Sequence, residues 1–263
     1  MISARFIQFF SELYGSRNVL RQLIAQQLIL RYRRTLLGYL WTLINPLLMM
    51  SVMAVVFSAL FKADLQTFAI FLFAAMIPWN FFNSVVTQSG AAFINNEGLI
   101  KKIYLPKALF PLSIASALLI DSLFAFVALF AIIIALGGTI SWALLFLPIS
   151  YLLLFVFSMG FGMIISVATV FFRDLQYVMT IAMQALFFLT PILYKPDALS
   201  GKIRWVIEMN PVTPFIALFR APLIDGTLPS SLVLLQATMI SFATMAVGLF
   251  IFIRHEKAIV YRL

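Results

Sequence analysis

The feature that most constrains this chain is a stretch from Ser122 to Phe172 that contains no Asp, Glu, Lys or Arg. About 20 apolar residues are enough for a helix to cross the hydrocarbon core of a bilayer, so this stretch is long enough for two crossings. The rest of the chain is similar, because 63% of its 263 residues are hydrophobic and only 18 Lys+Arg and 9 Asp+Glu are charged. This composition excludes a water-soluble domain. It predicts an all-α membrane protein.

Charged residues and turn residues divide the apolar sequence into six segments of membrane-spanning length. We interpret Gly137-Gly138-Thr139 as a tight turn within the long uncharged stretch, because glycine adopts backbone angles that end a helix. The chain is then a single transmembrane domain, residues 1–263. Its six predicted spans are Gly38–Phe61, Phe68–Ile94, Ala108–Leu136, Trp142–Phe172, Leu175–Tyr194 and Ser230–Ile253.

The positions of the basic residues predict the orientation of the chain. Six crossings place both termini on one side of the membrane, and thirteen of the 18 Lys and Arg residues then fall on that side. Cytosolic loops of membrane proteins carry an excess of Lys and Arg. We therefore expect a multi-pass protein of the inner (plasma) membrane with both termini in the cytosol.

Two further apolar segments are not expected to cross the membrane. In residues 1–37, apolar side chains alternate with arginines and glutamines at nearly helical spacing, which predicts an amphipathic helix along the cytosolic interface. A cleavable signal peptide is not expected, because the apolar run is short and interrupted by Glu12. Residues 195–229 divide at Asn210-Pro211 into Ala198–Met209 and Thr213–Ile224. We expect two short outer-leaflet helices there, between the fifth and sixth spans.

Composition also excludes several kinds of chemistry. The chain has no Cys and a single histidine, His255, so thiolate metal sites, cysteine nucleophiles and most metal centres are not expected. The net charge of +9 is too diffuse for a nucleic-acid footprint. It suits cytosolic loops that face anionic membrane lipids.

Several motifs occur in the same order as in a known family of membrane proteins. They are Arg31 to Trp41 followed by Asn45-Pro46, Ile77 to Phe82, Asn95 to Pro106, Phe172-Arg173-Asp174, and Asn210-Pro211 with Arg220 and Gly226. In these motifs, which extend over nearly the whole chain, the sequence resembles permease subunits of type-2 ABC exporters. Within that class it resembles the polysaccharide exporters, which move O-antigen, capsule or teichoic-acid chains on a lipid carrier.

The resemblance implies a division of labour between subunits. Two copies of the chain would form a homodimer with a passage for the lipid-linked glycan, and two separate ABC ATPase subunits would bind from the cytosol. The sequence agrees, because a Walker A loop requires G-x-x-x-x-G-K-[ST] and Gly201-Lys202 is followed by Ile203. We therefore expect a transport subunit that is not an enzyme and holds no cofactor, with ATP and Mg²⁺ on the partner.

Residues 95–107 are the candidate contact with the ATPase. The segment starts with Asn95-Asn96-Glu97, typical of a helix N-terminus, carries a short apolar stripe, and stops at Pro106. The resemblance implies a coupling helix whose apolar side chains enter a groove of the ATPase. Its expected residues are Asn96, Glu97, Leu99, Ile100, Lys101 and Lys102. From the residues alone, an interfacial turn held in the cytosol by its lysines explains the same pattern.

A basic cluster, Arg31, Arg33 and Arg34, precedes the first span at the expected depth of the lipid headgroups. Arginine binds phosphate through a bidentate fork, so the cluster could hold the phosphate of a lipid-linked glycan. Anchoring to anionic lipid explains the cluster equally well. By resemblance, Leu37 and Gly38 would form a movable entrance to the passage.

Asp121 is an acidic side chain well within a predicted span. A carboxyl group inside the membrane is costly, so it is expected to face protein or water, or to be protonated. It is a candidate functional residue. A packing role is the alternative, because Ser113, Ser116 and Ser122 could satisfy a neutral carboxyl locally.

Aromatic residues make up 15% of the chain. Sugar rings stack on aromatic rings, so aromatic side chains along a passage would form a weakly adhesive track for a polymer. The candidates are Tyr39, Trp41, Trp79, Phe81 and Phe82. Contact with lipid is the alternative, because Trp and Tyr gather at membrane interfaces.

Three other functions compete with polysaccharide export. A type-2 permease for a small drug or lipid would share the same motifs. A membrane enzyme acting on lipid-linked sugars would need paired carboxylates, whereas Glu12, Glu97, Asp174 and Glu256 fall in separate segments. An ion-coupled carrier usually shows repeated halves, and no convincing internal repeat is visible.

Overall fold

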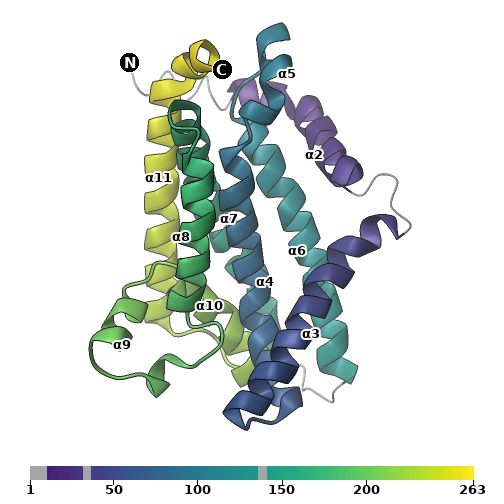
Figure 1. Cartoon of the computed structure of the whole chain (residues 1–263), viewed down its shortest axis with the longest axis vertical. Coiled ribbons are helices and arrows are strands. Elements are labelled where there is room, and N and C mark those ends of the chain that lie inside the picture. Colours follow the sequence, from purple (N-terminus) through teal and green to yellow (C-terminus); the bar gives the residue numbers. More distant parts are fainter. Residues whose placement is uncertain (1–10, 32–36, 136–140) are drawn as a thin grey trace.

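The computed structural model describes residues 11–31, 37–135 and 141–263, which form a bundle of helices (Figure 1). The long helices are α3 (Trp41–Phe61), α4 (Leu65–Gly90), α6 (Leu109–Ala135), α7 (Leu147–Phe171), α8 (Leu175–Leu189) and α11 (Ser231–Arg262). The shorter helices are α2 (Arg17–Arg31), α5 (Glu97–Lys102), α9 (Gly201–Glu208) and α10 (Thr213–Arg220). The remaining single turns are η1 (Gly38–Leu40), η2 (Ile94–Asn96), η3 (Trp142–Phe146), η4 (Pro196–Ala198) and the π-helical η5 (Ala221–Asp225). These three ranges contain no strand, and the predicted all-α class is confirmed.

Five helices in the described residues are long and apolar enough to cross a membrane. They are Leu43–Phe61, Leu65–Gly90, Leu109–Ile134, Trp142–Phe171 and Ser231–Arg262. Within the predicted fifth span, Leu175–Tyr194, the helix α8 has 15 residues and ends at Leu189. At 1.5 Å per residue α8 is about 22 Å long, less than the roughly 30 Å of a bilayer core. The predicted turn Gly137-Gly138-Thr139 lies outside the described residues.

The two ends of the bundle carry different elements. In Figure 1, α2, α5 and the C-terminal end of α11 lie at one end, and α9, α10 and the turn between α3 and α4 lie toward the other. We call these the α5 end and the α9 end. Helix α4 is central, because it packs against α3, α6, α7, α8 and α10. Helix α11 continues beyond Ile253, the predicted end of the sixth span, through the basic residues to Arg262.

The closest packing is between α7 and α11. A Cβ atom added to Gly160 would lie 2.6 Å from the backbone nitrogen of Met245, so only glycine fits there. The Ser241 hydroxyl of α11 also donates to the Leu153 carbonyl of α7 at 2.9 Å. On another face of α7, an added Cβ on Gly162 would lie 2.8 Å from the Ser89 Oγ of α4. Small side chains thus bring the α7 backbone close to both neighbours.

The segments predicted to lie outside the membrane form helices with different degrees of burial. Helix α2 packs against α6, and its Leu23 is buried. At the α9 end, the two predicted short helices are present as α9 and α10. Helix α9 is mostly exposed, whereas Phe215 and Phe219 of α10 are fully buried among α4, α7 and α11. The α10 helix is therefore part of the core and not a surface helix.

Candidate functional site

The predicted coupling segment forms the short helix α5 at one end of the bundle (Figure 1). Asn96 occupies the N-cap position, but its side chain does not cap the helix, because its Nδ2 donates to the Ala92 carbonyl at 2.8 Å. The helix ends at Lys102, four residues before Pro106. At its surface, Glu97 and Lys101 form an ion pair of 2.6 Å. The hydrogen bond from Lys101 lowers the pKa of the Glu97 carboxyl.

The apolar residues of this segment do not all face outward. Ile100 is only 8% exposed and belongs to the chain's own core, and Leu99 packs partly against that core. The prediction that Ile100 enters a groove of another subunit is therefore wrong for this structure. Ile103 and Tyr104, just after the helix, are 54% and 75% exposed. Other apolar residues near this end, such as Phe172 and Tyr261, are exposed as well.

Tyr104 also connects the segment to the N-terminal part of the chain. Its hydroxyl donates to Glu12 Oε2 at a long 3.5 Å, and the Lys107 ammonium lies 4.7 Å from the centre of its ring. The negative charge of Glu12 raises the pKa of the Tyr104 phenol. These contacts join the segment after α5 to the residues that precede α2.

The expected entrance is described only in part. Arg33 and Arg34 lie outside the described residues, and Arg31 is the last residue of α2. Leu37 is exposed, and Gly38 has a φ of +51° and enough space that an added Cβ would meet nothing within 4 Å. Glycine adopts this left-handed conformation at little cost, whereas other residues are strained there. Gly38 thus allows the chain to change direction directly before η1 and α3.

Most of the aromatic residues predicted to line a passage are packed inside the chain. Trp79 and Phe82 are 3% and 1% exposed. The ring of Trp79 contacts Phe187 of α8 edge-on at 5.7 Å, and the ring of Phe82 stacks on Phe157 of α7 at 4.9 Å. Both are therefore core residues here, which corrects their predicted role as a sugar track. Trp41 is exposed at the start of α3, Phe81 lines a cavity, and the Tyr39 side chain is not described.

Asp121 lies on the wall of a cavity of about 410 Å³ between α3, α4 and α6, which we call the polar cavity. Its described lining includes six polar side chains. They are Asn45 of α3, Asn80, Ser84 and Gln88 of α4, and Asp121 and Ser122 of α6. Asn80, Ser84 and Gln88 are not among the predicted site residues, although their spacing of four residues in an apolar helix marks one polar face.

The serines expected to satisfy Asp121 make other contacts. The Ser113 hydroxyl donates to the Phe110 carbonyl at 2.8 Å, and the Ser122 hydroxyl lies 3.3 Å from the Tyr151 hydroxyl of α7. Ser113 and Ser122 thus have hydrogen-bond partners of their own, and a packing role for Asp121 stays a prediction. Asp121 faces the polar cavity, as expected for a carboxyl group within a span.

Arg220 connects several elements at the α9 end. It belongs to one of the family motifs in the sequence but is not among the predicted site residues. Its two terminal nitrogens donate to the Pro191 and Ile192 carbonyls at 2.6 and 2.7 Å. Its guanidinium carbon lies 3.7 Å from the centre of the Phe71 ring of α4. One side chain therefore connects α10, α4 and the segment that follows α8. A planar five-donor group is suited to this task, and a lysine is not.

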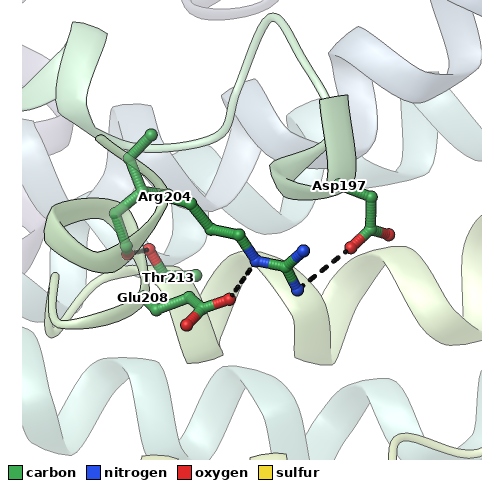
Figure 2. A network of polar contacts seen from close by, with 5 residues as sticks. Asp197, Arg204, Glu208 and Thr213 are labelled. Carbon is green, nitrogen blue, oxygen red and sulfur yellow. Dashed lines mark hydrogen bonds and ion pairs between the residues drawn. The ribbon is translucent and has the colours of Figure 1, made fainter. Parts of the chain in front are cut away.

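A second arginine at the α9 end has an exposed and simpler role (Figure 2). Arg204 Nε donates to Glu208 Oε1 at 2.7 Å, and a terminal nitrogen lies 3.5 Å from Asp197 Oδ1. The hydrogen bond to Glu208 raises the pKa of Arg204. Beside this network the Thr213 hydroxyl donates to the Ile207 carbonyl at 2.7 Å. The Thr213 contact joins the start of α10 to α9, whereas the Arg204 contacts stay within η4 and α9.

Comparison with known proteins identifies relatives of the whole chain. The O-antigen export system permease protein RfbA of Klebsiella pneumoniae is 30% identical over 205 residues, which cover 77% of this chain and 79% of the relative. The protein of the same name in Myxococcus xanthus is 26% identical over 89% of this chain and 91% of its own. The polysialic acid transport protein KpsM of Escherichia coli is 25% identical over 90% of this chain and 93% of its own.

A family model gives the same result. The model described as ABC-2 type transporter matches residues 18–224, from the second residue of α2 to the last residue but one of η5. This match confirms the resemblance to permease subunits of type-2 ABC exporters that the sequence motifs indicated. The chain belongs to the ABC-2 type transporter family.

Proposed function

We propose that this chain is the permease subunit of an ATP-driven exporter that carries a lipid-linked polysaccharide, of the O-antigen kind, across the inner membrane. The observation that supports this most strongly is the 30% identity to an O-antigen export permease over most of both chains. A bundle with five apolar helices of spanning length agrees with a multi-pass permease. The chain itself is a transport subunit and not an enzyme.

In this proposal residues 1–263 form one domain that crosses the membrane six times. Helix α8, together with the segment up to Tyr194, makes the fifth crossing. Support comes from Figure 1, in which α8 extends from near the α5 end toward the α9 end, and from the packing of α8 against α4 and α7. Both termini are then cytosolic, and Lys101, Lys102, Arg254, Lys257 and Arg262 follow the positive-inside rule.

Two copies of the chain form a homodimer, and two ABC ATPase subunits bind at the α5 end. ATP and Mg²⁺ bind to those subunits. Helix α5 is the coupling element, with Lys101 and Lys102 exposed beside the apolar Ile103 and Tyr104. Closure of the ATPase dimer displaces α5, and the contact between Tyr104 and Glu12 passes the displacement to the N-terminal segment.

The substrate enters from the cytosolic leaflet near the junction of α2 and α3. Arg31, Arg33 and Arg34 bind the phosphate of the lipid carrier, because arginine pairs with phosphate through two parallel hydrogen bonds. Leu37 and Gly38 move to admit the headgroup. The left-handed conformation of Gly38 supports this role, since it marks the change of direction before α3.

Deletion of the gene in its host tests the proposal. We expect cells to lose surface polysaccharide and to accumulate the lipid-linked glycan on the cytosolic side of the inner membrane. A plasmid with the wild-type chain should restore export, and a plasmid that encodes an inactive ATPase partner should not. Normal surface polysaccharide in the deletion strain would overturn the proposal.

A further inference from the structure

The polar cavity occupies a part of the bundle where polar groups are costly. Gln88 is in the last turns of α4, from which the chain continues to α5. Asp121 lies about 18 Å along α6 from Leu109, at 1.5 Å per residue. The cavity therefore extends from near the α5 end to about the middle of the helices that enclose it.

The lining is arranged so that polar side chains from three helices converge. Asn80, Ser84 and Gln88 follow one face of α4, each one turn after the last. Asp121 on α6 and Asn45 on α3 face the same space. The three helices pack against one another, so the convergence is a property of the fold and not of one segment.

This arrangement is unfavourable in contact with lipid tails. The carboxyl group and the three amide groups of the lining are costly to place against hydrocarbon. Water or a hydrophilic ligand removes that cost. The volume of about 410 Å³ is within the range of roughly 300–1,000 Å³ that is typical of small-molecule sites.

The chemistry of the lining indicates which hydrophilic ligand fits. Amide side chains donate and accept, hydroxyls do both, and a carboxyl group accepts, which together match the hydroxyl groups of a sugar. The described lining contains one carboxyl group and no lysine or arginine, so it offers no partner for phosphate or an acidic sugar. It therefore differs from the arginine cluster before α3.

We propose that the polar cavity binds an uncharged, hydroxyl-rich segment of the exported glycan and disfavours an anionic one. The proposal rests on the proposed function for the existence of a glycan cargo. It adds the recognition groups, Asn45, Asn80, Ser84, Gln88 and Asp121, and the charge class of the sugar. The phosphate of the lipid carrier binds elsewhere.

The absence of cysteine from the chain permits a direct experiment. Ser84→Cys places a thiol in the polar cavity, and Val52→Cys places one on the apolar face of α3, where Val52 is exposed and does not line the cavity. With the full chain in nanodiscs, a water-soluble thiosulfonate should modify Ser84→Cys at least about tenfold faster than Val52→Cys. Equal rates at the two positions would overturn the claim that the cavity holds water or a hydrophilic ligand.

Protection by oligosaccharides tests the ligand class. A neutral gluco-oligosaccharide should slow the modification of Ser84→Cys several-fold, and its carboxymethylated, anionic counterpart should not. Adding Asp121→Asn should leave protection by the neutral probe intact, because asparagine still hydrogen-bonds, and should increase protection by the anionic probe. Equal protection by both probes in the chain with Asp121, or no protection by either, would overturn the proposal.

Export assays separate this inference from the proposed function. Asn80→Leu and Asp121→Leu should reduce glycan export about tenfold or more, while thermal unfolding and binding to the ATPase remain those of the parent chain. Normal export by both variants would contradict the cavity's role and leave the exporter assignment standing. Normal glycan export by the deletion strain would contradict the exporter assignment. The sugar site would still stand if the neutral oligosaccharide slowed the modification of Ser84→Cys.

Discussion

Gly160 of α7 and Gly248 of α11 lie in direct backbone contact, so that a Cβ atom on Gly248 would overlap the carbonyl oxygen of Gly160. No other pair of long helices in the described structure is packed as extensively as α7 and α11. Small residues at such a crossing allow close van der Waals packing, which is an important source of helix association in membranes. Close packing at this crossing therefore depends on the two glycines.

Substitution of Gly248 by alanine should weaken this crossing. The added methyl group forces the two backbones apart, and overpacking of this kind costs about 1–3 kcal/mol. We expect a clear fall in the thermal unfolding midpoint of the purified protein. Gly15→Ala is the matched control, since a Cβ at Gly15 meets nothing within 4 Å. An equal midpoint for the two variants would show that the contact is not tight in the membrane protein.

Arg220 should be required for the structure of the α9 end. Arg220→Lys loses one of the two hydrogen bonds to the carbonyls of Pro191 and Ile192. A buried carbonyl without its partner costs about 1–3 kcal/mol, and the planar contact with Phe71 is lost as well. We expect Arg220→Lys to lower the unfolding midpoint and to increase proteolysis between α8 and α9.

Arg204→Lys is the control for that experiment. Arg204 is exposed and pairs with exposed acids, and surface ion pairs contribute little to stability. Its midpoint should equal that of the unsubstituted chain. Equal losses at Arg204 and Arg220 would contradict the distinction between a surface ion pair and a buried clamp.

Asp64 should give the start of α4 a dependence on pH. Its carboxylate accepts from the Thr67 N–H and hydroxyl at 2.9 and 2.8 Å, and these hydrogen bonds lower its pKa below the ordinary 3.8. Its stabilising contribution is therefore complete above pH 3.8 and is lost as the pH falls through the lower folded pKa. Asp64→Ala should lower the unfolding midpoint at pH 7, and the difference from wild type should shrink in stronger acid.

Asp64→Asn provides the comparison, because asparagine caps helices without titrating. The unfolding midpoint of Asp64→Asn should be close to that of wild type at neutral pH. It should not show the loss that protonation of Asp64 causes in wild type as the pH falls. If Asp64→Ala and wild type differed by the same amount at pH 7 and in strong acid, the cap would not depend on the ionised carboxylate.

The exposed end of the α5 segment should be needed for coupling, and its buried residue for folding. Ile103→Glu places a charge on an exposed apolar surface, so the unfolding midpoint of the chain should not change. The amount of ATPase subunit that co-purifies with the chain should fall several-fold. Ile100→Glu buries a charge in the chain's own core and should lower the midpoint instead. The reverse pattern would show that Ile100 and not Ile103 faces the ATPase.

Much of the fold could be predicted from the sequence because the membrane leaves few choices. Long uncharged segments must be helical, and charges and prolines mark where they end. The helix in the predicted fifth span ends before Tyr194 because Pro191 follows Thr190 at the end of α8. The apolar residues Ile192 and Leu193 continue as non-helical buried chain. Hydrophobicity alone does not distinguish a helix from a buried loop.

The candidate site was less predictable because it depends on which face of each helix meets a neighbour. Trp79 and Phe82 are aromatic residues of the kind on which sugar rings stack. In the structure, however, both rings lie in the contact between α4, α7 and α8. Asp121 is evident from the sequence because an intramembrane carboxyl group is conspicuous. Its neighbours across the cavity, Asn45 and Asn80, belong to other helices, and only tertiary packing brings them together.

Transport by purified components tests the central claim most directly. The chain is reconstituted in proteoliposomes with a lipid-linked glycan, with or without the ABC ATPase encoded in the same organism, and the arrival of glycan at the opposite face is followed with a lectin. We predict arrival only when the ATPase, ATP and Mg²⁺ are all present, and none with a hydrolysis-deficient ATPase. Equal arrival without the ATPase would contradict the account.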